Sequence, residues 1–325
     1  MMKLHYTILI FFISLNNTLS QSHQEIIKFE SANPFSLNDI IENLDLQEKQ
    51  KVSGKLRLPI DNENLNKKFP LIIGVAGSLG WADHHFEYLK MYREMGIATF
   101  ELNSFKSREI TSTVGTQNEV TIAAIILDAY RAFEILSKHP RIDRDRISIT
   151  GWSLGGGVTL FSAWLPVNNA INQNVKFKSH LAFYPPCFFE PENIQFSDSP
   201  IHILIGELDN WTPAKPCEGF VSKLKNNSAN INLTIYEGSH HSFDKDSPVI
   251  RNENAYNFSD CLFKLTEDGN ILMNYLNIPM SNSFLQKLGF MFCVSRGVNY
   301  GGNPVSREKS FAFAKKFMRE TLLED

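Results

Sequence analysis

Residues 147–164 read ISITGWSLGGGVTLFSAW, and this stretch decides the fold class. Its first part, Ile147 to Trp152, is a short apolar run of the kind found in a buried strand. Glycines then flank Ser153 in a G-x-S-x-G motif, and the apolar VTLFSAW that follows favours a helix. The sequence therefore predicts a strand, a strained turn that carries Ser153, and a helix packed closely against the strand.

Other short apolar runs lie on both sides of this stretch, and longer helical patterns separate them. We expect an edge strand over Val52–Pro59 and buried strands over residues 71–76, 97–102, 180–184, 201–206 and 233–236. The predicted helices cover residues 85–94, 120–137, 215–225 and 307–322. This alternation predicts the α/β class, with a mostly parallel central sheet and helices on both faces.

The composition indicates a single globular domain over residues 21–325 with a small-molecule ligand. The chain has 325 residues, of which 43% are hydrophobic, enough for a large core. Its formal net charge is -3 and its basic residues are spread thinly. A nucleic-acid partner is therefore not expected, because no basic stripe is present to neutralise phosphates.

The N-terminus has the features of a signal peptide. Lys3 precedes the apolar run TILIFFISL at residues 7–15, and small residues follow at Thr18 and Ser20. The run is shorter than the ~20 apolar residues of a membrane-spanning helix. We therefore expect residues 1–20 to be removed on export to the periplasm or the extracellular space, leaving no stable membrane anchor.

Residues 244–302 show little periodicity, and we expect an irregular C-terminal insertion packed on the main domain. The chain has four cysteines, an even number that suits disulfides in an oxidising compartment, and four cysteines allow three pairings. We expect Cys187–Cys217, because both residues follow the ends of neighbouring strands. We expect Cys261–Cys293, because these residues bracket the insertion.

A serine hydroxyl needs a base to remove its proton and a carboxylate to orient that base. In the chain order Ser, Asp, His, the acid is expected at Asp209, directly after the strand 201–206. The base is expected at His241, after the strand 233–236. His240 is the alternative base, and Glu207 and Asp244 are the alternative acids.

Cleavage of an acyl group also needs hydrogen-bond donors for the oxyanion. We expect one from the backbone N–H of Leu154, at the start of the helix after the nucleophile. The second is expected from the backbone N–H of Ser78, in the loop AGSLG at residues 76–80.

Several segments together resemble the dienelactone hydrolase family of α/β-hydrolases, from about Val52 to Asp244. They are VSGKLRLP, FPLIIGVAGSLG, REITSTVGTQ, HPRIDRDRISITGWSLGGG, ILIGELDNWTP and YEGSHHSFD, with a weaker similarity in the final VNYGGNPVSREKSFAFAKKFM. The resemblance implies an α/β-hydrolase fold, with Asp209 as the acid and His241 as the base. The family has Ser or Cys at the position of Ser153, and dienelactone hydrolase itself has Cys.

Other residues near these motifs allow either a functional or a structural interpretation. Trp81, Trp152 and Trp211 adjoin the site loops, where they either line an apolar pocket or pack structurally, with Trp152 beneath the turn. Arg108 and Asp128 match positions in the family pattern and are explained equally well by a buried ion pair. Asp83, His84 and His85 are adjacent in sequence and point in different directions on a helix, so no metal site is expected.

The sequence therefore predicts a carboxylic ester hydrolase that acts on small or hydrophobic acyl esters, or on lactones, through an acyl-serine intermediate without metal or cofactor. The same triad also suits a polyester or cutinase-like hydrolase, a peptidase or an acyltransferase. A secreted binding protein on an inactive hydrolase scaffold is the alternative from another class.

Overall fold

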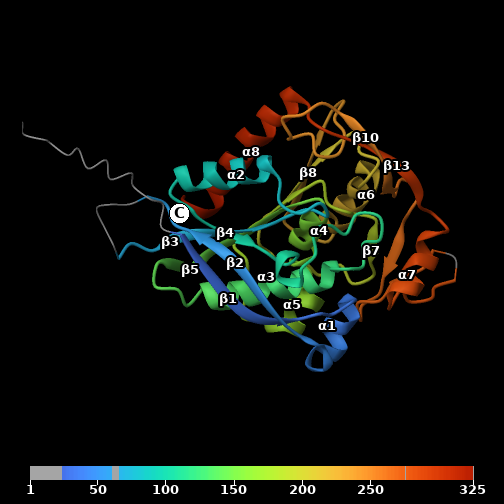
Figure 1. Cartoon of the computed structure of the whole chain (residues 1–325), viewed down its shortest axis with the longest axis horizontal. Helices are drawn as coiled ribbons and strands as arrows, with labels where there is room; N and C mark the ends of the chain where they lie inside the picture. The colour runs from blue at the N-terminus through green and yellow to red at the C-terminus, as the bar shows by residue number, and fades with distance from the viewer. Residues whose placement is uncertain (1–23, 61–65, 275, 325) are drawn as a thin grey trace, which may run out of the picture.

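The computed structural model describes residues 24–60, 66–274 and 276–324, so the expected signal segment 1–20 lies outside the described residues. A central sheet of eight strands has the order β1-β2-β4-β3-β5-β6-β8-β9 (Figure 1). These strands are β1 (Gln24–Ala32), β2 (Lys49–Arg57), β3 (Phe69–Val75), β4 (Ala98–Leu102), β5 (Ile142–Trp152), β6 (His180–Phe183), β8 (Ile201–Gly206) and β9 (Ile231–Tyr236). Pairing is antiparallel from β1 to β4 and parallel from β4 to β9.

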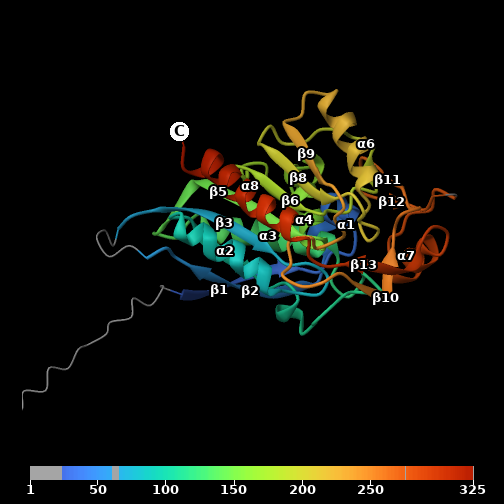
Figure 2. The same ribbon diagram turned by 90° about the horizontal axis from the view of Figure 1, so that it is seen from above.

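Helices cover both faces of this sheet, which confirms the predicted α/β architecture. Figure 1 shows α2 and α8 together on one side and α3 and α5 on the other, and Figure 2 shows α6 beside β8 and β9. The helices are α1 (Leu37–Asn43), α2 (Asp83–Glu94), α3 (Ile122–Leu136), α4 (Leu154–Phe161), α5 (Leu165–Asn172), α6 (Ala214–Lys225), α7 (Ser283–Phe290) and α8 (Pro304–Leu322), with 3₁₀ turns at Leu44–Leu46 and Lys106–Arg108. Strands β3 and β4 are buried at every position, as expected of parallel strands with both faces covered.

The predicted edge position of the strand at Val52–Pro59 is wrong. That strand, β2, lies between β4 and β1, and β1 forms the edge. The sequence of β1, QEIIKFESA, alternates in burial along most of its length, with every second residue exposed. Gln24, Lys28 and Glu30 face solvent along this sheet edge, as does Ile26, and the strand was missed because polar residues interrupt its apolar ones.

The C-terminal insertion, residues 244–302, is more regular than predicted. It contains helix α7 and the strands β10 (Ile250–Asn257), β11 (Phe263–Leu265), β12 (Ile271–Leu272) and β13 (Ser295–Tyr300). β10 pairs with β13, while β11 pairs with β12 and with β7 (Phe189–Pro191) of the main domain. Phe258, Phe263 and Phe290 belong to a small apolar core that the insertion shares with Phe188 and Trp211. The insertion is thus packed against the end of the sheet that carries the site.

Both expected disulfides are present, Cys187–Cys217 and Cys261–Cys293. Cys261–Cys293 connects two segments of the insertion that each contribute a ring to its apolar core. Phe258 and Phe290 lie three residues before Cys261 and Cys293. Within the described residues, no helix is both long enough and apolar enough to span a membrane.

Arg108 and Asp128 form a buried ion pair, with Nη1 2.7 Å from Oδ2 and Nη2 3.1 Å from Oδ1. The guanidinium also donates to Asn33 Oδ1 and to the carbonyl oxygens of Ala32 and Ser104. The pair therefore anchors the segment after β1 to helix α3. This geometry favours the structural interpretation of the two residues.

Candidate active site

Ser153 lies at the turn between β5 and α4 with φ 57° and ψ -115°. A positive φ is unfavourable for a residue other than glycine, and such strain is typical of a nucleophile held above the end of a sheet. The turn is held by the N–H of Ser153, which donates to the carbonyl of Phe183 at 2.9 Å. Sequence analysis predicted this strand, turn and helix correctly.

Glycine at position 155 allows α4 to begin directly against the end of β3. A Cβ atom at Gly155 would lie 2.2 Å from the carbonyl oxygen of Val75 and 2.6 Å from that of Ala76. Both oxygens belong to backbone, so a side chain here would push the helix away from the strand. The close approach brings the start of α4 next to the loop after β3, which contains Ser78.

Ser153, His241 and Asp209 form one continuous chain of hydrogen bonds. Ser153 Oγ lies 2.9 Å from His241 Nε2, and His241 Nδ1 lies 2.7 Å from Asp209 Oδ2. Because the carboxylate accepts from Nδ1–H, the Nε2 lone pair faces the serine hydroxyl, which donates to it. His241 and Asp209 are almost fully buried, whereas Ser153 is partly exposed. The three residues follow β5, β8 and β9, where parallel strands end at one edge of the sheet.

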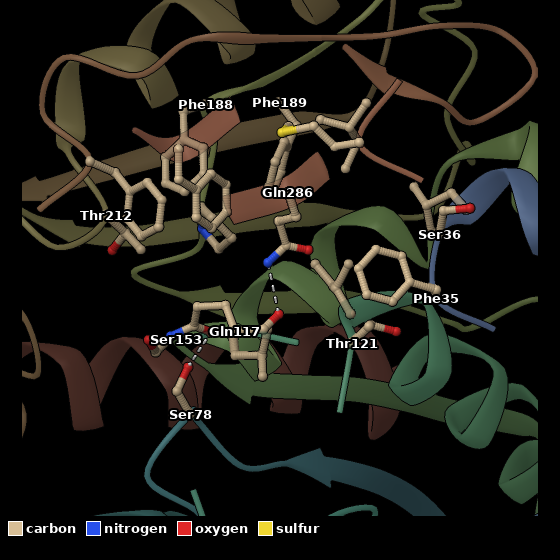
Figure 3. Close-up of a pocket in the computed structure, with 18 of the residues that line it drawn as sticks. Phe35, Ser36, Ser78, Gln117, Thr121, Ser153, Phe188, Phe189, Thr212 and Gln286 are labelled. Atoms are coloured by element: carbon tan, nitrogen blue, oxygen red, sulfur yellow. Dashed lines mark hydrogen bonds between the residues drawn. The ribbon is translucent and has the colours of Figure 1, made fainter. Parts of the chain in front are cut away.

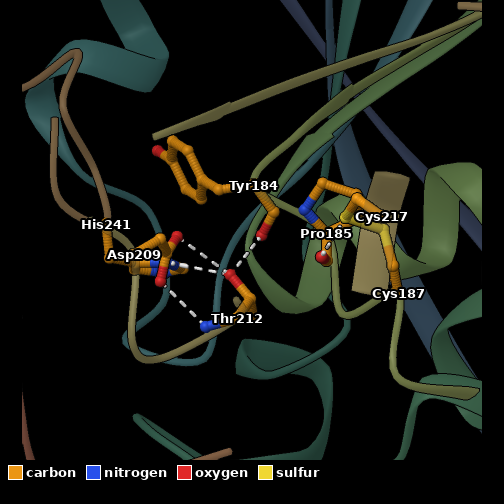
Figure 4. The surroundings of a disulfide bond; sticks show 7 residues. All are labelled: Tyr184, Pro185, Cys187, Asp209, Thr212, Cys217 and His241. Atoms are coloured by element: carbon orange, nitrogen blue, oxygen red, sulfur yellow. Dashed lines mark hydrogen bonds and ion pairs between the residues drawn. A yellow bond between two sulfur atoms is a disulfide. The ribbon is translucent and has the colours of Figure 1, made fainter. Parts of the chain in front are cut away.

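Thr212 holds the acid in place, as Figure 4 shows. Asp209 Oδ1 accepts from the backbone N–H of Trp211 at 2.9 Å and of Thr212 at 2.8 Å. The Thr212 hydroxyl lies 3.1 Å from Asp209 Oδ2 and 3.1 Å from His241 Nδ1, and it donates to the carbonyl of Tyr184 at 2.9 Å. These contacts fix the carboxylate against the loop after β6. Sequence analysis missed Thr212, because a threonine three residues after an acid is no distinctive pattern.

The alternative base and acids lie elsewhere. His240 Nδ1 donates to the carbonyl of Leu208 at 3.1 Å, and Glu207 accepts from the N–H of Gly238 at 2.8 Å. Asp244 is fully buried and accepts from the Tyr184 hydroxyl at 2.9 Å, while its Oδ2 has no hydrogen-bond partner in the described part of the chain. None of the three has a hydrogen bond to Ser153 or His241 among those described.

The two expected oxyanion donors lie on the loop and helix beside Ser153. The N–H of Leu154 is the first of helix α4, so it has no partner within the helix. Ser78 is buried in the neighbouring loop, which is held by the N–H of Thr113 donating to the Ser78 carbonyl at 3.0 Å. Ser78, Leu154 and Ser153 line one cavity.

That cavity, of about 100 Å³, opens on Ser153 and is mostly apolar (Figure 3). Phe35 and Phe188 lie on opposite sides of it, as the figure shows. Phe258, Met280 and Phe290 of the insertion contribute further wall. Trp211 also lines it, with its ring 4.9 Å from that of His241, so this tryptophan lies at the site.

Trp152 and Trp81 do not line this cavity. Trp152 is fully buried beneath the turn, where it stacks on His85 at 4.4 Å and on Phe183 at 5.4 Å. It contributes to a second, smaller cavity of about 50 Å³ on the other side of Ser153. Trp81 donates to the carbonyl of Leu102 at 3.3 Å, packs on Phe86 of α2, and lines a separate cavity of about 170 Å³ beside Phe105 and Ile110.

Two glutamines connect the insertion with the Ser78 loop. Gln286 of α7 donates from Nε2 to the carbonyl oxygens of Thr116 at 3.3 Å and Gln117 at 3.2 Å. Gln117 in turn accepts from the Ser78 hydroxyl at 3.2 Å (Figure 3). No local pattern in the sequence marks either glutamine, because their partners are brought together only by folding.

Burial disfavours the charged forms of the two histidines of helix α2. It lowers the pKa of His84, although the nearby Asp244 carboxylate opposes the shift, and it lowers the pKa of His85 well below its usual value. Asp83, His84 and His85 form no metal-ligand cluster, nor does any other group of His, Cys, Asp or Glu among the described residues.

Comparison with known proteins identifies the family of the chain. The family model of the dienelactone hydrolase family matches residues 91–262, more than half of the chain. One curated relative is the probable 2-oxo-3-(5-oxofuran-2-ylidene)propanoate lactonase of a Bradyrhizobium species. It is 26% identical over 123 residues, which is 37% of this chain and 48% of that protein, so the match spans about half of the relative.

Solved structures show the same fold. A dienelactone hydrolase-like promiscuous phosphotriesterase from metagenomic libraries is 12% identical, with a TM-score of 0.52 over 91% of this chain and 98% of its own. The structure named m3DLH is 13% identical, with a TM-score of 0.54 over 92% of this chain and 99% of its own. At these identities the likeness concerns the fold alone.

Proposed function

The chain belongs to the dienelactone hydrolase family, and from this premise we propose that it hydrolyses carboxylic esters or lactones through an acyl-serine intermediate on Ser153. The observation that carries the proposal is the unbroken hydrogen-bond chain from Ser153 through His241 to Asp209. All three residues lie inside the segment that the family model matches.

The reaction proceeds in two halves. Ser153 Oγ attacks the carbonyl carbon while its proton passes to His241 Nε2, and the negative charge that develops on the carbonyl oxygen is stabilised by the N–H groups of Ser78 and Leu154. The bond between the acyl carbon and the leaving oxygen then breaks, and His241 gives its proton to that oxygen. A water molecule, deprotonated by His241, next attacks the acyl-serine and releases the acid and the free Ser153 hydroxyl.

Asp209 has a positioning and electrostatic role in both halves. It holds the imidazole with Nδ1 protonated and stabilises the imidazolium without taking its proton. The hydrogen bonds from the backbone of Trp211 and Thr212 support this role, because they keep the carboxylate oriented when the imidazole becomes charged.

The decisive test compares alanine variants of Ser153 and His241 with a control variant at the neighbouring His240. Ser153→Ala and His241→Ala should each lose on the order of 10⁴-fold or more in kcat on a short ester. The matched control His240→Ala should keep most activity, because His240 contacts the carbonyl of Leu208 rather than Ser153. A fluorophosphonate should label Ser153 in the wild-type enzyme. Full activity of Ser153→Ala would disprove the acyl-serine mechanism, and an inactive His240→Ala beside an active His241→Ala would disprove the assignment of the base.

We also propose that the protein is exported. Two disulfides are typical of an oxidising compartment, and the N-terminal residues have the pattern of a cleavable signal.

A further inference from the structure

Two cavities meet at Ser153, and they differ in which side of the triad they adjoin. Ser153, Ser78 and Trp211 line both of them. His241 lines the small cavity and does not line the large one. This asymmetry decides how an ester must lie in the site.

The leaving oxygen must lie next to His241, because it receives its proton from Nε2 when the ester bond breaks. The leaving group therefore belongs in the small cavity, on the side of His241. The acyl group, which stays on Ser153, then extends into the large cavity. On the basis of the function proposed above, we infer that the enzyme prefers esters of a ring-sized, uncharged apolar acid with a small alcohol.

The walls of the large cavity support an uncharged aromatic or branched acyl group. None of the described residues that line it carries a charge. The Phe258 ring stacks on that of Phe188 at 4.6 Å and meets that of Phe290 edge-on at 5.3 Å. A carboxylate placed among these rings would lose its hydration without gaining a partner. The volume of the large cavity, about 100 Å³, is of the same order as the ~150 Å³ of an apolar cavity that holds benzene.

Much of this cavity comes from outside the segment that the family model matches. Phe35 precedes residues 91–262, and Ile271, Met280 and Phe290 follow them. The N-terminal segment and the insertion of this chain thus complete a pocket whose other wall, with Ile122, Phe188 and Phe189, lies inside the matched segment.

The small cavity has a different chemistry. It measures about 50 Å³, and among the described residues that line it Lys245 is the one Lys, Arg, Asp or Glu. Lys245 lies over the Tyr300 ring with Nζ 5.0 Å from the ring centre, and it is half-buried. The cavity therefore takes a small alcohol, and an alcohol that carries an anionic group gains from Lys245.

Two isomeric esters test the orientation. Methyl phenylacetate places the ring on the acyl side, and benzyl acetate places it on the alcohol side, while both release an unactivated alcohol. Because burial of a phenyl ring contributes about 1.5–3 kcal/mol, kcat/KM should be at least tenfold higher for methyl phenylacetate. Equal rates, or a preference for benzyl acetate, would overturn the orientation while leaving the acyl-serine mechanism intact, provided that both reactions require Ser153. If neither ester is cleaved although the short ester used above is, the inferred acyl preference fails and the acyl-serine mechanism stands.

Variants in each cavity separate the two subsites. Ile271→Phe narrows the large cavity and should reduce the preference for methyl phenylacetate several-fold, whereas the control Ile278→Phe, on an insertion residue that lines neither cavity, should not. Lys245→Gln should lower the rate ratio between the phenylacetyl esters of glycolate and of glycolamide, by up to about fivefold for a partly exposed charge. Lys316→Gln, at an exposed side chain of α8, is the matched control. An unchanged ratio in Lys245→Gln would disprove the anionic preference, and an unchanged preference in Ile271→Phe would disprove the acyl pocket.

Discussion

The two disulfides form a matched pair for testing what each contributes. Cys187–Cys217 closes a loop with a sequence separation of 30, and Cys261–Cys293 one of 32. The loss of chain entropy in the unfolded state is therefore nearly the same for both. It corresponds to about 3.7 kcal/mol of stability for each disulfide in the loop-entropy treatment. For about 300 folded residues this is a fall in Tm of roughly 6 °C.

We therefore expect the double variants Cys187→Ala/Cys217→Ala and Cys261→Ala/Cys293→Ala to be destabilised equally. Urea unfolding at pH 7 and scanning calorimetry measure the two losses. Losses that differ by more than about 2 kcal/mol would refute the entropic reasoning, because loop length alone does not distinguish the pairs. Such a difference would mean that one bridge also holds native packing or unfolded-state structure.

The functional effects of the Cys261–Cys293 bridge follow from its location. It is close to Phe258 and Phe290, the rings of the insertion in the wall of the large cavity. Its removal should raise KM for methyl phenylacetate several-fold, because the wall must then be ordered when the acyl group binds. Labelling of Ser153 by a small fluorophosphonate should be unchanged, since Asp209 and His241 lie on other segments. An unchanged KM would show that the apolar core of the insertion holds the wall without the bridge.

Two further predictions concern pH and export. Burial lowers the pKa of His180 to about 4, although its hydrogen bond to the carbonyl of Thr159 opposes the shift. Between pH 6.5 and 4 the unfolded state binds a proton that the folded state does not. As the pH falls through this window, His180 should therefore reduce the free energy of unfolding by about 3 kcal/mol. Above pH 6.5 its protonation should have no effect on the free energy of unfolding. In His180→Leu, the free energy of unfolding measured in urea should therefore depend less on pH than in the wild type. If the wild type and the variant lose the same free energy between pH 6.5 and 4, the lowered pKa of His180 is contradicted. For export, the mass of the secreted chain should lack about twenty N-terminal residues; a full-length secreted chain would disprove cleavage.

The parts of the fold that the sequence predicted share one property, which is local patterning. The nucleophile turn is specified within five residues by glycines that permit close backbone contact, so Ser153 is recognisable without any knowledge of tertiary structure. Asp209 and His241 follow from chain order, because consecutive parallel strands deliver their C-terminal ends to the same edge of the sheet. The edge strand β1 was missed because polar residues alternate with most of its apolar ones, so the segment lacks an apolar run.

The substrate pocket had no comparable signal. Its rings come from Phe35, Phe188, Phe258 and Phe290, which lie on four segments that are far apart in the sequence and meet only after folding. The insertion was predicted to be irregular because its strands are short and pair across distant residues, as β10 does with β13. Pattern analysis finds elements whose partners are nearby, whereas these elements are stabilised by tertiary contacts.

The separation between reaction and selectivity in this enzyme follows from the same distribution of residues. The groups proposed to carry the reaction, Ser153, His241 and Asp209, are held by hydrogen bonds at the ends of the central strands. The insertion touches one of them, because the N–H of Gly301 donates to the carbonyl of His241 at 2.9 Å. Part of the wall of the large cavity, inferred to hold the acyl group, consists of side chains of the N-terminal segment and the insertion, such as Phe35, Met280 and Phe290. A change in the insertion can therefore alter which acid is accepted without moving the nucleophile. A second contact is the link from Gln286 through Gln117 to Ser78, which connects the insertion to the expected oxyanion donor. Through the two glutamines, a change in the order of helix α7 at the pocket wall should also shift the backbone N–H of Ser78.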